Sequence, residues 1–305
     1  MPAPGTESPV DRQLRIWRTH RRPVPADAGM RALTARRLGP ILGDLERLML
    51  DLREGVDRDV ETGVLALPRR RHAFPEGYCR EITDAVLHRL NQRIAAPDTP
   101  AAAALAAFVG EGGQLGLIWG DLRDRYFQNA LQIGDLYVDV ANDTVDVTKH
   151  KVEILPLDKS GLRDIADIGH FARIAHAYWG GEVWANTVFP RLAPVLPVIH
   201  VGPEGRVALH PDSLSLFAEN LIGGCRSALA FLTAEREAGR RVPAEVAASL
   251  SGWQSRGEWF GAFSPEPDWR VLQLCFDSVA DPDGPYRSPR GFLGIIEATK
   301  LAASA

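Results

Sequence analysis

Apolar side chains recur at helical spacing in two segments of the first hundred residues. The first set follows Pro40 and consists of Ile41, Leu45, Leu48 and Leu52. The second set follows Cys79 and consists of Ile82, Val86, Leu90 and Ile94. Residues three or four apart lie on one face of a helix, so both sets predict amphipathic helices. The first is expected to end near Gly55, and Thr99-Pro100 opens a third, alanine-rich helix.

The pattern changes from helical spacing to alternation between residues 114 and 140. Segments 114–119, 125–133 and 136–140 have the composition of strands, and Gly134-Asp135 is a two-residue turn between the last two. Within segment 125–133 polar side chains alternate with mostly apolar ones, which predicts one polar and one apolar face. Residues 152–155 are a candidate fourth strand. The central part of the chain is therefore predicted to form an antiparallel sheet.

After residue 160 most of the pattern is helical again. Segments 198–201 and 206–209 predict a small second hairpin, and a long helix is predicted from Asp212 or Ser213 through Leu232. The predicted fold class is α+β: a central antiparallel sheet packs on the helix that bears Cys79, with helical N-terminal and C-terminal parts. We expect a mobile basic arm over residues 1–30, an α+β core over 31–157, and a mostly helical part with the small hairpin over 158–305.

The bulk composition narrows the function classes. The chain has 305 residues, 45% of them hydrophobic and 24% charged, which is typical of a globular protein of one or two domains. A formal net charge of −4 gives no overall attraction to nucleic acid or to an anionic membrane, and the early arginines fit a solvated arm. We expect neither a secretory signal nor a membrane span. Three cysteines are too few for a disulfide framework, so we expect reduced thiols in a cytoplasmic protein.

Cys79 lies where a catalytic thiol would lie, at the start of a helix. Backbone N–H groups without helical partners, together with the positive end of the helix dipole, stabilise a thiolate there. Such a thiolate is a nucleophile for acyl transfer. The alternative is an ordinary buried residue, because free cysteine is among the most buried residue types. Cys225 and Cys275 lie in apolar surroundings and are expected to be core residues.

Two segments within residues 74–147 carry a family resemblance. They read Phe74-Pro75-Glu76-Gly77-Tyr78-Cys79 and Tyr126-Phe127-Gln128-Asn129-Ala130-Leu131-Gln132-Ile133-Gly134-Asp135-Leu136-Tyr137-Val138-Asp139-Val140. This order resembles the transglutaminase-like branch of the papain-like cysteine superfamily, in which a cysteine opens a helix, a histidine starts a strand, and a hairpin supplies an aspartate. The resemblance implies Cys79 as nucleophile, Asp139 as orienting carboxylate, and cysteine-dependent acyl transfer or amide hydrolysis as the activity.

The strand that should carry the family's histidine reads Tyr126-Phe127-Gln128-Asn129. Glutamine and asparagine do not titrate, and tyrosine has a pKa of about 10, so no side chain in this stretch acts as a general base near neutral pH. Two histidines elsewhere are candidate replacements. They are His72, just before the cysteine loop, and His150, after the hairpin.

Three functions remain open from the sequence. The first is the cysteine-dependent enzyme. The second is a non-catalytic relic of that fold, which binds a peptide or a small molecule through Gln128, Asn129 and Tyr126. The third is a protein-interaction module that uses the aromatic C-terminal tail, in which tryptophan and phenylalanine are frequent. No nucleotide-binding motif and no set of metal ligands is apparent, so we expect no cofactor, no metal and no nucleic-acid partner.

Overall fold

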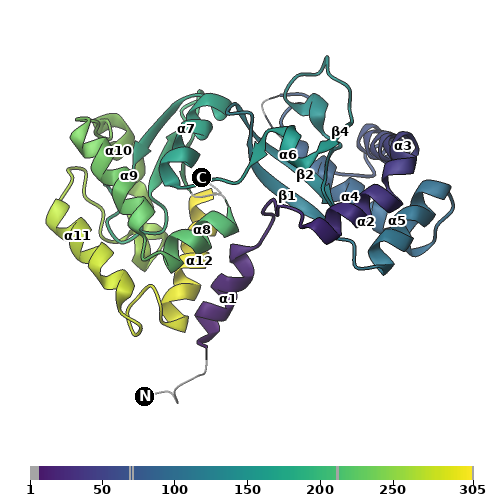
Figure 1. Ribbon diagram of the computed structural model, residues 1–305. Coiled ribbons are helices and arrows are strands. Elements are labelled where there is room, and N and C mark those ends of the chain that lie inside the picture. The colour runs from purple at the N-terminus through teal and green to yellow at the C-terminus, as the bar shows by residue number, and fades with distance from the viewer. Residues whose placement is uncertain (1–6, 69, 71, 211–212, 304–305) are drawn as a thin grey trace. The chain divides into compact units, whose positions relative to one another are not determined.

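The structure is a computed structural model that describes residues 7–68, 70, 72–210 and 213–303 (Figure 1). The chain is a mixed α+β protein with an antiparallel sheet and helical N-terminal and C-terminal parts, which confirms the predicted fold class. It divides into two compact units. One unit is Arg21–Asp164, and the rest of the described chain, on both sides of that segment, forms the other. The predicted boundaries at residues 30 and 157 therefore differ from the observed ones.

The helices of the Arg21–Asp164 unit follow their local sequence signals. They are α2 (Ala28–Arg37), α3 (Leu42–Glu61), α4 (Cys79–Ala95), α5 (Pro100–Gly110) and the short α6 (Leu157–Ser160). Thr99 caps α5 through its side chain, and Pro100 occupies the first turn, where its missing N–H costs nothing. The α3 helix continues six residues past the predicted end at Gly55. Val56 is fully buried and extends the apolar stripe, so burial outweighs the low helix propensity of glycine.

The sheet of this unit has the strand order β4-β3-β2-β1-β5. Its strands are β1 (Leu115–Leu122), β2 (Tyr126–Ile133), β3 (Leu136–Asp139), β4 (Glu153–Pro156) and β5 (Leu162–Arg163). All neighbouring strands pair antiparallel, and Ile133 pairs with Leu136 around the predicted Gly134-Asp135 turn. Gly134 has a φ of +63°, and a Cβ there would lie 2.1 Å from the Thr34 hydroxyl of α2. Only glycine fits this turn.

The two faces of this sheet have different neighbours. Residues of α3, α4 and α5 form one apolar core with the face of β2 and β3 that carries Leu131, Ile133 and Val138. The opposite face carries Ala130 and Tyr137, which join a smaller cluster with β1. This separation of faces decides which polar side chains can reach Cys79, because successive strand residues point to opposite faces.

The other unit surrounds a three-stranded antiparallel sheet with helices. Its strands β6 (Glu182–Ala185), β7 (Val198–Val201) and β8 (Val207–His210) pair in sequence order, which confirms the predicted small hairpin and adds one strand. Its helices are α1 (Pro9–Arg18), α7 (Ile168–Trp179), α8 (Leu214–Ile222), α9 (Arg226–Glu237), α10 (Ala244–Leu250), α11 (Trp269–Asp277) and α12 (Pro289–Ala303). None of the helices in the described residues is long and apolar enough to span a membrane.

Residues 9–18 form a packed helix in place of the mobile arm expected over residues 1–30. Ser8 caps α1, and Val10 and Leu14 are buried. The Trp17 ring lies 5.9 Å from that of Phe217 and 5.5 Å from a second aromatic ring in α12. The apolar residues of this segment, spaced at four and three positions, outweigh the prolines and arginines around them. Residues 1–6 of the expected arm lie outside the described residues.

The long helix predicted from residue 212 or 213 to Leu232 is two helices. A break after Ile222 contains Gly224 with a φ of +67° and Cys225 with a φ of +55°. The backbone N–H of Cys225 donates to the Asn220 carbonyl at 2.7 Å, which closes the end of α8. Two successive glycines supply the conformational freedom for this break. Cys225 is fully buried, as expected for a core residue.

Candidate functional site

Cys79 is the first residue of α4 and lies against β2. Its side chain is buried, and its Sγ accepts a hydrogen bond from Asn129 Nδ2 at 3.5 Å. The Thr83 hydroxyl, one turn along α4, lies 2.7 Å from the Cys79 carbonyl and 3.2 Å from the Asn129 carbonyl. This buried hydroxyl bridges the first turn of α4 to β2. The structure therefore brings together the predicted cysteine and one of the three predicted binding residues.

The surroundings of Cys79 disfavour its thiolate. Burial raises the pKa of the thiol above its ordinary value. Hydrogen bonding from Asn129 lowers it in part, while the charges of Asp139 and Glu81 raise it further. The sequence predicted the opposite direction from the helix N-terminus alone. Loss of hydration is the larger effect here, and the protonated thiol is favoured at neutral pH.

Both ends of the Asn129 amide have partners. Its Oδ1 accepts from Arg21 Nη1 at 3.0 Å, and Arg21 Nη2 donates to both oxygens of Asp84 at 2.9 and 3.1 Å. A guanidinium has donors only, so the amide must turn its oxygen to Arg21 and its NH₂ group to the sulfur. A continuous chain of polar contacts thus runs from Asp84 through Arg21 and Asn129 to Cys79. Sequence reasoning missed Arg21 because its segment appeared to be a mobile arm.

Asp139 lies on the other face of the sheet. Its Oδ2 accepts from Gln128 Nε2 at 2.7 Å and from the Tyr137 hydroxyl at 2.8 Å, and its Oδ1 accepts from the Ala141 N–H at 2.8 Å. Burial raises its pKa from 3.8 to about 6, although these three hydrogen bonds oppose the change. Leu131 pairs with Val138 and shares the face of Asn129, so the residues next to them point the other way. The predicted Gln128 and Asp139 therefore meet each other but hydrogen-bond to neither Cys79 nor Asn129.

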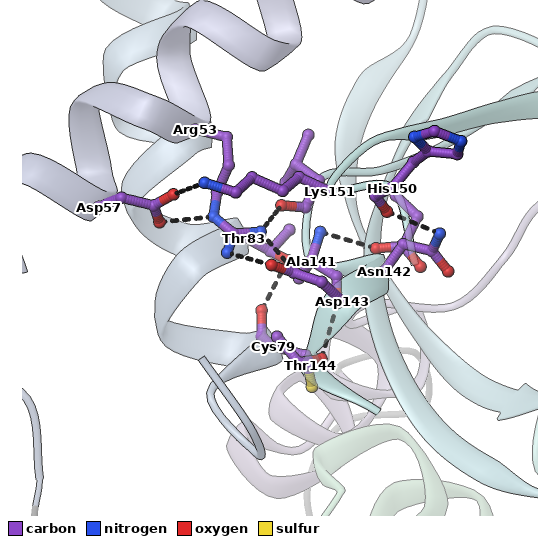
Figure 2. A network of polar contacts seen from close by, with 12 residues as sticks. Arg53, Asp57, Cys79, Thr83, Ala141, Asn142, Asp143, Thr144, His150 and Lys151 are labelled. Carbon is purple, nitrogen blue, oxygen red and sulfur yellow. Dashed lines mark hydrogen bonds and ion pairs between the residues drawn. The ribbon is translucent and has the colours of Figure 1, made fainter. Parts of the chain in front are cut away.

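The structure describes both candidate histidines, His72 and His150. His72 Nδ1 is 3.1 Å from Glu76 Oε1, and the His72 side chain is about half exposed. His150 is exposed, its backbone carbonyl accepts from Asn142 Nδ2 at 2.9 Å, and its ring points away from Cys79 in Figure 2. Neither histidine hydrogen-bonds to Cys79 within the described residues. The predicted Tyr126 is half-buried at the start of β2, and Lys149 Nζ lies 5.6 Å from the centre of its ring.

A buried arginine, missed from the sequence, fixes the loops around this site (Figure 2). Arg53 of α3 is 1% exposed and donates to both oxygens of Asp143 at 2.7 and 2.9 Å and to Asp57 at 2.7 Å. Lys151 donates to the second oxygen of Asp57 at 2.6 Å. The Thr144 carbonyl, next to Asp143, accepts the Gly77 N–H at 3.0 Å, which holds the loop before Cys79. One signal was present: Arg53 precedes Asp57 by four residues on the apolar face of a helix.

The second unit contains a separate cavity beside α12. Its volume is about 830 Å³, within the range of small-molecule sites. Arg191, Arg256 and Arg290 supply guanidinium groups, and Trp259 forms part of the wall. Leu293, also on the wall, is 62% exposed. The aromatic tail thus contributes partly to a core, as the 8% exposure of Trp259 shows, and partly to a cavity.

Among the described residues, the only side chain with a hydrogen bond to Cys79 Sγ is Asn129, which does not titrate. Asn129 beside the sulfur cannot accept its proton at neutral pH, and the carboxylate of Asp139 belongs to the opposite face of the sheet. Such an arrangement can recognise a polar or cationic group, whereas thiolate formation is disfavoured.

In the comparisons with known proteins, no family model, no curated protein and no solved structure matches this chain.

Proposed function

We propose that the Arg21–Asp164 unit is a non-catalytic binding module on a transglutaminase-like fold, and that the Cys79 site recognises a ligand instead of transferring an acyl group. The observation that carries this proposal is the 3.5 Å hydrogen bond from the Asn129 amide to Cys79 Sγ. A nucleophilic thiol needs an adjacent base or a lowered pKa. Cys79 has an amide beside it, and burial raises the pKa of its thiol.

The polar groups around the sulfur favour a cationic ligand. Asn129 Oδ1 and the Asp84 carboxylate both accept hydrogen bonds from one guanidinium, that of Arg21. A carboxylate and an amide oxygen placed side by side match the planar fork of donors on an arginine. This complementarity supports a peptide ligand with a basic side chain over an uncharged small molecule.

The test is the reactivity of the three thiols at neutral pH. Iodoacetamide labelling with mass mapping should show Cys275, which is partly exposed, alkylated faster than the buried Cys79. Cys225 should be slowest, since burial raises its pKa to about 12. The urea-unfolded chain is the control, in which all three thiols should label alike. Faster labelling of Cys79 than of Cys275, or an acyl group left on Cys79 by a reactive ester, contradicts the proposal.

A second candidate function rests on the cavity beside α12. Its three arginines and the exposed Leu293 on its wall favour a protein-interaction role for the C-terminal unit, with a peptide as the bound segment. The test selects peptides from a displayed library against the intact chain and titrates them on Leu293→Asp. Leu274→Asp is the matched control, because Leu274 is 68% exposed and does not line the cavity. Peptides whose affinity falls only in Leu293→Asp support this role, and equal losses in both variants oppose it.

A further inference from the structure

Residues 21–25, which we call the strap, have the sequence Arg21-Arg22-Pro23-Val24-Pro25 and are held by side chains of the same unit. Besides the contacts of Arg21 with Asn129 and Asp84, the Arg21 carbonyl accepts the Trp119 N–H at 2.6 Å. Arg22 pairs with Asp164. The strap site is therefore made of residues from α4, β1, β2 and the segment after β5. They are Asp84, Trp119, Asn129, Gln132 and Asp164.

The Gln132 side chain binds the main chain of the strap. Its Oε1 accepts the Val24 N–H at 3.0 Å, and its Nε2 donates to the Val24 carbonyl at 2.6 Å. This two-point contact makes the glutamine amide an equivalent of a neighbouring strand. Val24 itself is 49% exposed, so the site does not select for its side chain. Pro23 and Pro25 on either side favour the extended conformation that leaves the Val24 main chain accessible to Gln132.

The conformation of the strap indicates that its contacts hold it in place. Arg21 has a φ of +55°, in the left-handed region that residues other than glycine rarely adopt. Its side chain is 17% exposed, the lower of the two strap arginines, since Arg22 is 31% exposed. A strained backbone persists only where the surroundings fix it. Here the Trp119 N–H, the Asn129 amide and the Asp84 carboxylate do so.

We propose that the strap site binds extended basic peptides of the form Arg-Arg-Pro-x-Pro, and that the strap of the same chain occupies it in the absence of such a partner. This inference rests on the proposed function and names its ligand class. Two carboxylates, of Asp84 and Asp164, meet the two arginines, and Gln132 binds the main chain two residues further on. The site thus binds a charged side chain at two positions and the main chain at a third, and main-chain hydrogen bonds are a common source of affinity for extended peptides.

Because the strap occupies the strap site, a partner peptide must displace it in order to bind. A tethered segment acts at an effective concentration in the millimolar range for a short flexible link. A free peptide of the same sequence therefore binds the intact chain weakly, and weakening the strap raises its apparent affinity. Arg21→Ala removes the guanidinium that contacts Asn129 and Asp84 but leaves these two acceptors in place.

The experiment titrates a fluorescent, end-blocked Arg-Arg-Pro-Val-Pro peptide into the full chain and follows anisotropy. We expect Arg21→Ala to bind it at least tenfold more tightly than the unmodified chain. Arg47→Ala is the matched control, because Arg47 is an exposed arginine of α3 whose partner is Asp44, and it should bind like the unmodified chain. Adding Asp84→Asn or Gln132→Ala to Arg21→Ala should weaken peptide binding at least tenfold. A peptide with its first arginine replaced by alanine should bind no better to Arg21→Ala than to the unmodified chain.

Three results overturn the inference. One is a folded Arg21→Ala chain, judged by circular dichroism, that shows no saturable binding up to about millimolar peptide. The second is binding that Asp84→Asn leaves unchanged. The third is failure of both Arg21→Ala and the milder Arg21→Gln to fold, which would make the strap an integral part of the core. Thiol labelling of the same samples separates the two proposals. If Cys79 is unreactive and no peptide binds, only the strap-site proposal is wrong. If Cys79 is reactive, the proposed non-catalytic function is wrong.

Discussion

Replacement of Asp139 by asparagine should change how the stability of the protein depends on pH. Asp139 is fully buried, and burial raises its pKa from 3.8 to about 6. Between these two values the folded state binds a proton that the unfolded state has released. The free energy of unfolding therefore falls as the pH rises through this window, and the loss is complete above pH 6. Asp139→Asn carries no titrating group and should lack this fall.

The size of the effect follows from the two pKa values. Their difference, at 1.36 kcal/mol per pKa unit, corresponds to about 3 kcal/mol lost by the unmodified chain over the whole titration, from well below pH 3.8 to pH 7. The variant can keep most hydrogen bonds of the site. Gln128 Oε1 is buried and has no hydrogen-bond partner among the described residues, so a flipped Gln128 amide can accept from the new NH₂ group. The flip breaks the hydrogen bond from Gln128 Nε2 to the Ala141 carbonyl, which is long, at 3.3 Å, and the Tyr137 hydroxyl changes from donor to acceptor toward residue 139.

Urea unfolding at several pH values from 4 to 7.5 provides the measurement. The difference in unfolding free energy between Asp139→Asn and the unmodified chain should grow in favour of the variant by about 2 kcal/mol between pH 4 and pH 7.5. Taking the difference removes the contribution of every ionisable group that the two proteins share. Asp158→Asn, at an exposed aspartate of the same unit, is the matched control and should show no such trend. A difference that stays constant across the pH range would refute the reasoning.

Two further substitutions test how the site is held. Arg53→Met should destabilise the protein by about 3–5 kcal/mol in urea unfolding, because it leaves buried aspartates without their partner. Arg47→Ala, at an exposed ion pair, should cost less than about 1 kcal/mol, and equal losses in the two variants would contradict a buried network. Gly134→Ala should cost about 2 kcal/mol in the same assay, since the residue has a positive φ and a Cβ would meet Thr34. Unchanged stability of that variant would show that the turn adjusts.

The sheet and the Cys79 helix could be predicted because their periodicities are local. The alternation on both sides of Gly134-Asp135 predicts the strands and the turn between them. The four-residue repeat after Cys79 predicts the helix. The break after Ile222 was visible as two glycines, but the apolar pattern on either side favoured one helix. The α1 helix was missed because the prolines and arginines around it indicated a mobile arm. In the structure Val10 and Leu14 on its apolar face are buried.

The sequence alone could also have shown which candidate residues share a face of the sheet. A two-residue turn at Gly134-Asp135 makes Asn129 and Asp139 point to opposite faces, because each step outward from the turn changes the face on both strands together. The family resemblance placed Cys79 and Asp139 in one site and did not include this parity. The spacing could have paired Arg53 with Asp57 but not with Asp143, which is ninety residues away and is brought close only by the fold.

This separation of faces also differs from a cysteine–histidine–aspartate arrangement in a way that one substitution does not reverse. A histidine in place of Asn129 would lie beside Cys79 Sγ and could accept its proton. It would still lack an orienting carboxylate, because Asp139 points to the other face and is bound by Gln128, Tyr137 and the Ala141 N–H. The group that it would meet is the Arg21 guanidinium, a cation that disfavours an imidazolium at that place. The groups around Asn129 therefore bind the Arg21 guanidinium, and burial of Cys79 opposes the charge separation that a cysteine–histidine pair requires, although the Asn129 amide donates to the sulfur.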